Sequence, residues 1–208
     1  MKSRGWVLVA DMLGFKNEMS GKTDSIEGRI QELLNLWSDI QNKVSFCSLL
    51  VSDSMFIHWS CQDDSISISK SFNQARADIR TLLDRFTACD FLLRGAMTYG
   101  DVIITETVWA GEALFSAHRI ESTVLNAPLV AIPERYCANV EKKYLVGVPV
   151  RDLPTKSEGI QRFRLILPNK VQSLTSLLVK RYDDLAVNGP ADAAKKVRNA
   201  IDELKSQE

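Results

Sequence analysis

Two aspartates stand where a divalent metal ion could be bound. Asp11 directly follows a continuous apolar run that predicts a buried strand, and Asp53 lies between the apolar runs 46–51 and 55–59, which predict a hairpin. With a backbone carbonyl near Met12, the two carboxylates would form an oxygen-rich site of the kind that Mg²⁺ or Mn²⁺ prefers. Two such ions can activate a hydroxyl group and neutralise phosphate charge. The same positions equally fit a turn cap at Asp11 and a bend-favouring residue at Asp53.

The spacing of apolar residues predicts the elements that must position these aspartates. Helical spacing recurs over residues 24–44 and 72–86, and strands are predicted at 91–99 and 102–105. With the first strand and the hairpin, the order is β-α-β-β-α-β, for which the simplest fold is a four-stranded antiparallel sheet with two helices on one face. We therefore predict an α+β, ferredoxin-like fold in which both acids reach the same edge of the sheet.

The rest of the chain adds elements to this sheet. The pattern predicts a helix at 109–124, strands at 129–132 and 163–167, and helices at 171–185 and 191–204. No internal repeat and no linker long enough to divide the chain is found in the sequence. We expect a single domain over residues 1–208.

The composition narrows the classes of function. Among 208 residues, 26 are basic and 26 acidic, and this zero formal net charge argues against a protein that coats nucleic acid or an anionic membrane. Apolar runs fall short of the roughly 18 residues of a membrane span, and Asp11 interrupts the first run too early for a signal peptide. The four cysteines lack paired spacing and are expected to be free thiols. We expect a cytoplasmic protein with no direct membrane association.

Four segments, taken in order, resemble the catalytic domain of class III nucleotide cyclases. Ala10–Phe15 matches the Asp-x-x-Gly-Phe signature of that family, and Asp53 lies where the family carries its second metal-binding aspartate. Arg94–Gly100 resembles the Arg-x-Gly-x-x-x-Gly strand, and Gly111–Ser122 follows the helix pattern Gly-x-x-x-Asn-x-Ala-x-Arg-x-Glu-Ser. The resemblance covers residues 5–135, which would be the catalytic core, while residues 136–208 would complete the domain.

The resemblance implies a reaction and an assembly. Such enzymes are head-to-tail homodimers, in which one subunit supplies the metal-binding acids and the other the helix arginine. Two Mg²⁺ or Mn²⁺ ions activate the ribose 3′-hydroxyl, which attacks the α-phosphate and expels pyrophosphate. By this resemblance Asp11, the carbonyl of Met12 and Asp53 hold the ions. Arg119 would stabilise charge on the transferring phosphoryl group; its alternative is a surface ion pair with Glu121 or with Glu112.

Three positions depart from the family pattern. Phe115 replaces the asparagine that lies four residues before the arginine, so one polar donor is missing. Leu49 and Val108 occupy the positions that read the purine base, usually Lys and Asp for adenine or Glu and Cys for guanine. Neither can form a hydrogen bond with a purine edge, and an unpaired polar edge is costly in a closed pocket. Substrate contacts are also expected from Gly14 and Phe15. Tyr99 is a candidate contact to the base or ribose, and as a strand aromatic it is equally a candidate core residue.

These departures favour a pyrimidine substrate. With Arg-Gly-Ala-x-x-Tyr-Gly-Asp at residues 94–101 and Gly-x-Ala-Leu at 111–114, the chain most resembles the bacterial Pycsar pyrimidine cyclases. Those enzymes make cyclic UMP or cyclic CMP during phage infection for a separate effector protein. The resemblance therefore implies UTP or CTP as substrate and a role in antiphage defence. The alternatives are a catalytically degenerate regulator with the cyclase fold, which Phe115 favours, and a purine cyclase. A polymerase-like two-metal enzyme fits less well, because the chain has no basic stripe.

Other residues with reactive side chains are expected to be structural or exposed. His58 and His118 have no partner at metal-ligand spacing. Lys142 and Lys143 are expected to be an exposed pair, and the alternative is a contact with the triphosphate of a substrate.

Overall fold

The computed structural model describes residues 2–13, 23–41, 46–123, 129–155 and 159–188, together with 194, 197–198 and 201–202. Two expected substrate contacts, Gly14 and Phe15, lie outside these residues, as does most of the predicted helix 191–204. In the described part of the chain, no helix is both long and apolar enough to cross a membrane.

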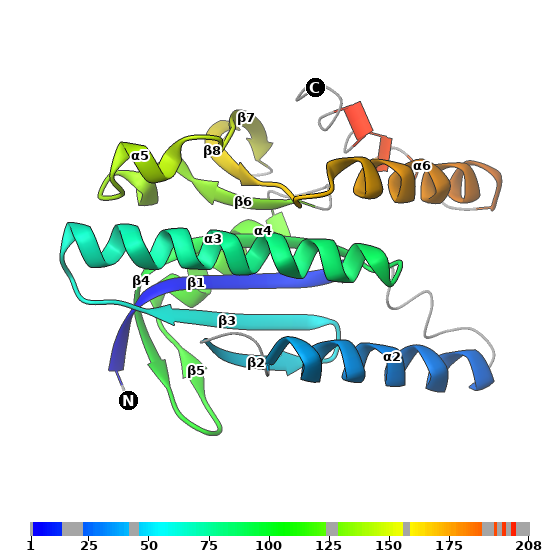
Figure 1. Cartoon of the computed structure of the whole chain (residues 1–208), viewed down its shortest axis with the longest axis horizontal. Coiled ribbons are helices and arrows are strands. Elements are labelled where there is room, and N and C mark those ends of the chain that lie inside the picture. Colours follow the sequence, from blue (N-terminus) through cyan, green and yellow to red (C-terminus); the bar gives the residue numbers. More distant parts are fainter. Residues whose placement is uncertain are drawn as a thin grey trace.

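The first half of the chain forms the predicted β-α-β-β-α-β unit (Figure 1). Its elements are β1 (Lys2–Leu13), α2 (Thr23–Gln41), β2 (Cys47–Val51), β3 (Ser54–Ser60), α3 (Ser65–Ala88) and β4 (Leu92–Ile104). The strands lie in the order β2-β3-β1-β4, and each neighbouring pair is antiparallel. Both helices contribute to one core cluster with the same face of β1. The predicted ferredoxin-like arrangement is confirmed.

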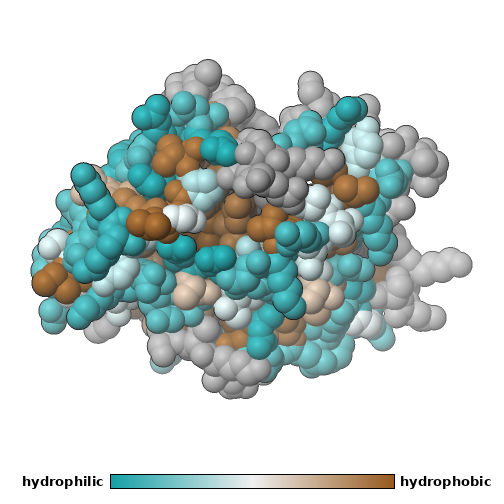
Figure 2. Space-filling model, turned by 45° about the horizontal axis from the view of Figure 1, so that its top comes forward, coloured by the Kyte–Doolittle hydropathy of each residue, from teal (hydrophilic) through white to brown (hydrophobic). Residues whose placement is uncertain are grey.

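The second half of the chain extends this sheet. Its elements are β5 (Trp109–Ala110), α4 (Glu112–Thr123), β6 (Val130–Pro133), a 3₁₀ turn (Glu134–Cys137), α5 (Lys142–Leu145), β7 (Val150–Thr155), β8 (Gly159–Ile166) and α6 (Val171–Asn188). β6 runs parallel to β4, and β8 and β7 continue the sheet beyond it. On the face shown in Figure 2, hydrophobic residues gather in a band across the middle, with hydrophilic residues around it.

Several predicted boundaries were wrong, and the strand β7 was missed. Helix α3 begins at Ser65, although the apolar pattern predicted it only from Phe72. The strand predicted to end at Tyr99 continues as β4 to Ile104, because Gly100 pairs with Gly5 and both strands run on past that pair. The helix predicted from Trp109 begins only at Glu112, since Trp109 pairs with Ile104 as part of β5. β7 was not predicted because it contains Pro154, which a strand tolerates at the edge of a sheet, where β7 lies.

The apolar run in β1 is continuous because both faces of this central strand are covered. Trp6, Leu8, Ala10 and Met12 pack in the cluster formed with α2 and α3, whereas Val7 and Val9 pack under α4. Side chains alternate between the faces of a strand, so the next residue on the α4 side after Val9 is Asp11. The alternation therefore directs the first aspartate toward α4 and away from the main core.

His58 is buried, and its Nε2 has no hydrogen-bond partner. Burial lowers the pKa of this imidazole to about 4, from 6.5. Between these two values the unfolded chain binds more protons than the folded one, so stability is lost as the pH falls. We predict that the free energy of unfolding drops by about 2 kcal/mol between pH 7 and pH 5 through His58 alone. Urea unfolding at both pH values measures this loss.

The control for this prediction is the second histidine. His58→Leu should remove this part of the pH dependence, whereas His118→Leu should leave it in place, because His118 is exposed on α4. An equal pH dependence in wild type and His58→Leu would contradict the assignment to His58.

Candidate functional site

The β2–β3 hairpin brings Asp53 to the end of β1. Ser52 and Asp53 form the turn between β2 and β3, and Ser52 has a positive φ of 58°. The N–H of Met12 donates a hydrogen bond of 3.0 Å to the carbonyl oxygen of Asp53, and Asp11 lies opposite Ser54 in the register of β1 and β3. The two aspartates predicted from the sequence are therefore brought to the same end of the sheet.

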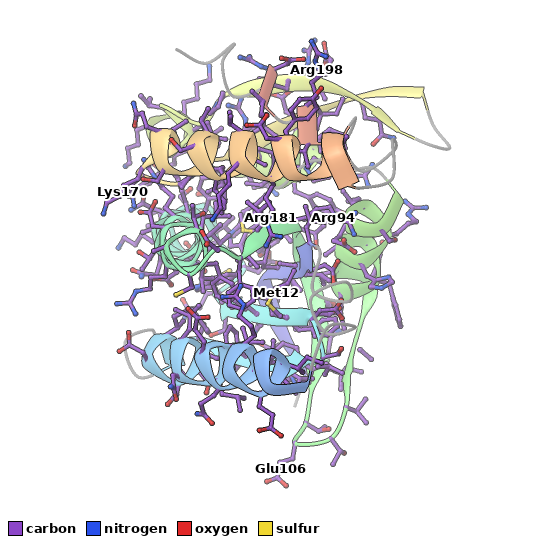
Figure 3. The ribbon with its side chains drawn as sticks, turned by 90° about the vertical axis from the view of Figure 1, so that its right-hand side faces the viewer. Met12, Arg94, Glu106, Lys170, Arg181 and Arg198 are labelled. Carbon is purple, nitrogen blue, oxygen red and sulfur yellow. The ribbon has the colours of Figure 1, made fainter. Side chains whose placement is uncertain are left out.

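Asp11 lies beside a basic side chain of the neighbouring strand. Arg94 is the register partner of Asp11 on β4, and its Nη2 lies 3.4 Å from Asp11 Oδ2. The same guanidinium donates from Nε to Glu121 Oε1 at 2.7 Å, and its Nη2 lies 2.5 Å from that oxygen. Figure 3 labels Arg94 beside the ribbon of α4, with Met12 below it. One guanidinium thus bridges a carboxylate of α4 and the carboxylate that ends the apolar run of β1.

This bridge is largely shielded from solvent. The side chain of Glu121 is 7% exposed, and those of Arg94 and Asp11 are 19% and 23% exposed. A buried carboxylate retains its charge only when it is paired and hydrogen-bonded, which is what Arg94 provides for Glu121. No role for Arg94 was predicted from the sequence, although it opens the quoted motif 94–100. Glu121, considered from the sequence as a surface partner of Arg119, is instead buried against Arg94.

Helix α4 carries Arg119 on its exposed side. Ala113 and Ala117 of this helix are buried against β1 and β4, and the hydroxyl of Thr98 donates to the carbonyl of Ala113 at 2.7 Å. Gly111 precedes the helix with a φ of 138°, and a Cβ there would lie 2.5 Å from Asp101 O, so only glycine fits this close approach. Arg119 is exposed. Arg119 therefore faces solvent, while Ala113 and Ala117 on the other side of α4 pack against the sheet.

Apolar side chains are exposed on the face of the sheet that carries Asp11. Leu49 pairs with Phe56 across β2 and β3, and Val51 pairs with Ser54, which in turn pairs with Asp11. Directly paired residues share a face. Both side chains are exposed, and so are Val108 before β5 and Phe115 on α4, which is 67% exposed. The expected base-reading positions Leu49 and Val108 thus point to solvent in the isolated chain and offer no hydrogen-bonding group.

Tyr99 is not brought to this site. It lies opposite Trp6, five register positions from the Asp11–Arg94 pair. Its ring packs at 5.2 Å from that of Trp6 on the α3 side of the sheet, and its hydroxyl lies 3.3 Å from Asp63. The expectation that Tyr99 contacts the substrate beside Asp11 is therefore not supported, because Tyr99 lies on the opposite face of the sheet from Asp11.

Lys142 and Lys143 form the exposed pair that the sequence predicts. Lys142 and Lys143 are exposed on α5, and Lys143 pairs with Glu141 at 2.6 Å. The pair is accounted for as charged surface.

The two aspartates suit a divalent cation that is shared with a substrate. Within the described ranges, no three His, Cys, Asp or Glu side chains converge as a complete metal-binding group. Mg²⁺ is commonly bound through one or two carboxylates plus substrate phosphates, with water in the remaining positions. Asp11 and Asp53 supply hard oxygen ligands of that kind. The donor set therefore fits Mg²⁺ or Mn²⁺ held jointly by protein and phosphate.

The fold is similar to that of solved nucleotide cyclase domains. The adenylyl cyclase CyaB from P. aeruginosa matches with a TM-score of 0.55 and 16% identity, over 80% of this chain and 95% of the other. The guanylate cyclase domain of RhGC from Catenaria anguillulae, solved with GTP, matches with a TM-score of 0.56 and 14% identity, over 81% and 98%. A non-canonical dimeric guanylyl cyclase domain of the RhoGC fusion protein from Blastocladiella emersonii matches with a TM-score of 0.57 and 14% identity, over 81% of this chain and 98% of the other.

These likenesses show that the chain has the fold of class III nucleotide cyclases. No protein-family model and no curated protein matches the sequence. The fold expected from the four sequence segments is thus the fold that these solved structures share.

Proposed function

We propose that this chain is a nucleotidyl cyclase that converts UTP or CTP into the 3′,5′-cyclic monophosphate and pyrophosphate. The observation that carries the proposal is the placement of two aspartates at one end of the sheet, within the cyclase fold, where the Met12–Asp53 hydrogen bond holds the hairpin against β1. In the reaction, the ribose 3′-oxygen forms a bond to the α-phosphorus, the bond to the pyrophosphate oxygen breaks, and the hydroxyl proton leaves to solvent.

Each site residue has a distinct role in this proposal. Asp11, Asp53 and the carbonyl of Met12 hold two Mg²⁺ or Mn²⁺ ions, which supply activation of the 3′-hydroxyl and neutralisation of phosphate charge when bound. Arg119 stabilises the charge that develops on the transferring phosphoryl group, since a guanidinium offers several donors in a fixed plane.

Two head-to-tail copies of the chain form the composite sites in this proposal. The exposed side chains of Leu49, Val51, Val108 and Phe115 would be covered by the second copy or by the nucleotide. Large apolar side chains that are exposed in the isolated chain are candidates for burial in such a contact. Among the similar structures, one is described as a non-canonical dimeric guanylyl cyclase domain and another as a monomeric one, so the head-to-tail arrangement itself rests on the sequence resemblance. With Arg119 exposed on α4, each copy could complete the site of its partner.

A pyrimidine base is favoured by the side chains at the two base-reading positions. Leu49 and Val108 offer apolar surface and no hydrogen-bonding group. These positions therefore lack the groups with which the family reads the adenine or guanine edge. A pyrimidine would also need its polar edge paired by other groups, so the choice of UTP or CTP rests on the resemblance to the pyrimidine cyclases. A purine cyclase, which would read the base through other groups, is the alternative within this reaction class.

The proposed setting is the cytoplasm of a bacterium that defends itself against phage. The cyclic product would be read by a separate effector protein, as the resemblance to the Pycsar cyclases implies. The four cysteines are all unpaired, which suits a reducing compartment.

The decisive experiment incubates the purified protein with Mn²⁺ and each of ATP, GTP, UTP and CTP in turn, beside the Asp53→Ala variant. A cyclic pyrimidine product that is lost in Asp53→Ala would establish the reaction and the base. A cyclic purine product would support the proposed cyclase activity but refute the proposed role of Leu49 and Val108 in favouring a pyrimidine. Binding of a nucleotide without turnover would instead favour a regulator with the cyclase fold, the candidate suggested by Phe115 in place of asparagine.

The base preference should change with two substitutions. We predict that Leu49→Lys combined with Val108→Asp raises the ratio of kcat/KM for ATP over UTP by about 10- to 100-fold, because the pair supplies the polar groups that adenine requires. Initial rates with both nucleotides measure the ratio. The control variant, Leu34→Lys combined with Val179→Asp, makes the same changes at exposed positions of α2 and α6. It should leave the ratio of kcat/KM for ATP over UTP unchanged. An unchanged ratio in the first variant would remove these positions from base recognition.

A further inference from the structure

We infer that Glu121 is a positioning residue that sets the affinity of Asp11 for the catalytic cation by taking the larger share of the Arg94 guanidinium, which also pairs with Asp11. The inference rests on the proposed function, since it concerns a metal ion at Asp11. It assigns a purpose to two side chains, Arg94 and Glu121, that the proposed reaction does not itself use.

The bridge places a permanent positive charge beside a proposed metal ligand. Arg94 Nη2 lies 3.4 Å from Asp11 Oδ2, close enough for an ion pair. A cation that binds Asp11 must therefore compete with this guanidinium for the same carboxylate. If Asp11 were the main partner of Arg94, the carboxylate would be neutralised before any metal arrived.

Glu121 draws the guanidinium to its own side. Its Oε1 lies 2.5 Å from Nη2 and 2.7 Å from Nε of Arg94, both shorter than the distance from Nη2 to Asp11. Charge-assisted hydrogen bonds at these lengths are the strong ones. The group of Asp11, Arg94 and Glu121 also carries one net negative charge, whereas Asp11 and Arg94 alone would be neutral. Asp11 therefore keeps part of its negative charge for a metal ion while it pairs with Arg94.

The burial of Glu121 makes this arrangement persistent. Only 7% of its side chain is exposed, so solvent screens its attraction for Arg94 poorly. It is carried by α4, which is fixed to the sheet through Ala117 and the Thr98–Ala113 hydrogen bond. The position of the carboxylate is therefore set by the packing of a whole helix.

The test measures Mn²⁺ binding directly. Free Mn²⁺ is followed by electron paramagnetic resonance in the presence of 3′-deoxy-UTP, which lacks the attacking hydroxyl and cannot be cyclised. Glu121→Gln keeps the size of the side chain and removes its charge. We expect its dissociation constant for Mn²⁺ to rise about 10-fold or more, as is usual when a group that orients a metal ligand is changed. In turnover with UTP, the Mn²⁺ concentration for half-maximal rate should rise by the same factor, and kcat at saturating Mn²⁺ should fall by a smaller one.

Two further variants separate positioning from a general effect on folding. Glu112→Gln makes the same change at the exposed start of α4 and should leave Mn²⁺ binding as in the wild type. The double variant Arg94→Gln with Glu121→Gln removes both the guanidinium that competes with Mn²⁺ for Asp11 and the carboxylate that pairs with it. This variant should restore the affinity for Mn²⁺. A loss of thermal stability in Glu121→Gln with unchanged Mn²⁺ affinity would overturn the inference, as would a double variant that binds Mn²⁺ no better than Glu121→Gln.

The same titration distinguishes a failure of the inference from a failure of the proposed function. Asp11→Asn must lose most of the Mn²⁺ binding if the proposed site is real. If wild type and Asp11→Asn bind Mn²⁺ equally, the proposed metal site is refuted and the inference with it. If Asp11→Asn loses binding while Glu121→Gln does not, only the role of Glu121 is refuted.

Discussion

Asp11→Asn is expected to lower metal-dependent turnover by about 100- to 1000-fold, because a bound cation supplies several kcal/mol of transition-state charge stabilisation. The amide keeps the size of the carboxylate but is a poor ligand for a hard cation. Arg94 retains its closer partner Glu121, so the local structure should survive the change. The rate of cyclic nucleotide formation, with the melting temperature measured alongside, checks this prediction.

The matched control for this variant is Asp101→Asn. Asp101 lies on the adjacent strand β4, in an exposed ion pair with Lys2 near the other end of β1. Exposed ion pairs contribute about 1 kcal/mol or less, so this variant should retain both activity and stability. Full activity in Asp11→Asn would exclude the proposed metal site, whereas equal losses in both variants would indicate a general effect of charge.

Mixing Asp11→Asn subunits with Arg119→Ala subunits is expected to restore activity that neither variant has alone. In a head-to-tail dimer, each site takes its acids from one copy and its arginine from the other. A mixed dimer then has one doubly damaged site and one intact site. Random exchange makes about half the dimers mixed, so about a quarter of the wild-type rate should return. Activity is measured after the two differently tagged variants are mixed, and again on the isolated mixed dimer.

The geometry of α4 is the reason for expecting complementation. Residues in an α-helix are about 100° apart around its axis, so Arg119 and Glu121 point to nearly opposite sides of it. Glu121 is directed to the Arg94–Asp11 pair of its own chain, and Arg119 is exposed. Mixing Asp11→Asn with Asp53→Ala subunits is the control, because both changes damage the same half of the site and should give no recovery. No recovery in a verified Asp11→Asn and Arg119→Ala dimer would contradict the head-to-tail arrangement.

The predicted elements that proved correct are those with long, regular apolar patterns. α2 and α3 each bury one stripe against the same core cluster, and the β2–β3 hairpin is bounded by small polar residues. Such patterns report local geometry, which does not depend on distant partners. The end of β4 and the start of α4 were predicted less well, because Gly100 and Trp109 are placed by their pairing with Gly5 and Ile104.

The sequence by itself determined that Asp11 and Asp53 end up together. Asp11 follows the buried part of β1, and Asp53 lies in the two-residue turn before β3. Because the order β-α-β-β-α-β places β3 beside β1, the two residues must lie at the same end of the sheet. The sequence likewise shows directly that Leu49, Val108 and Phe115 are apolar where the family pattern has hydrogen-bonding side chains.

Only the tertiary structure decided which charges meet. Arg94 and Glu121 are 27 residues apart, and their pairing depends on how α4 lies across β4. The face occupied by Tyr99 follows from the register of β4 with Trp6 on β1, and that register places Tyr99 away from the acids. Side-chain charge interactions act through space over a few ångströms. They are therefore set by packing between elements, which the order of residues along the chain does not reveal.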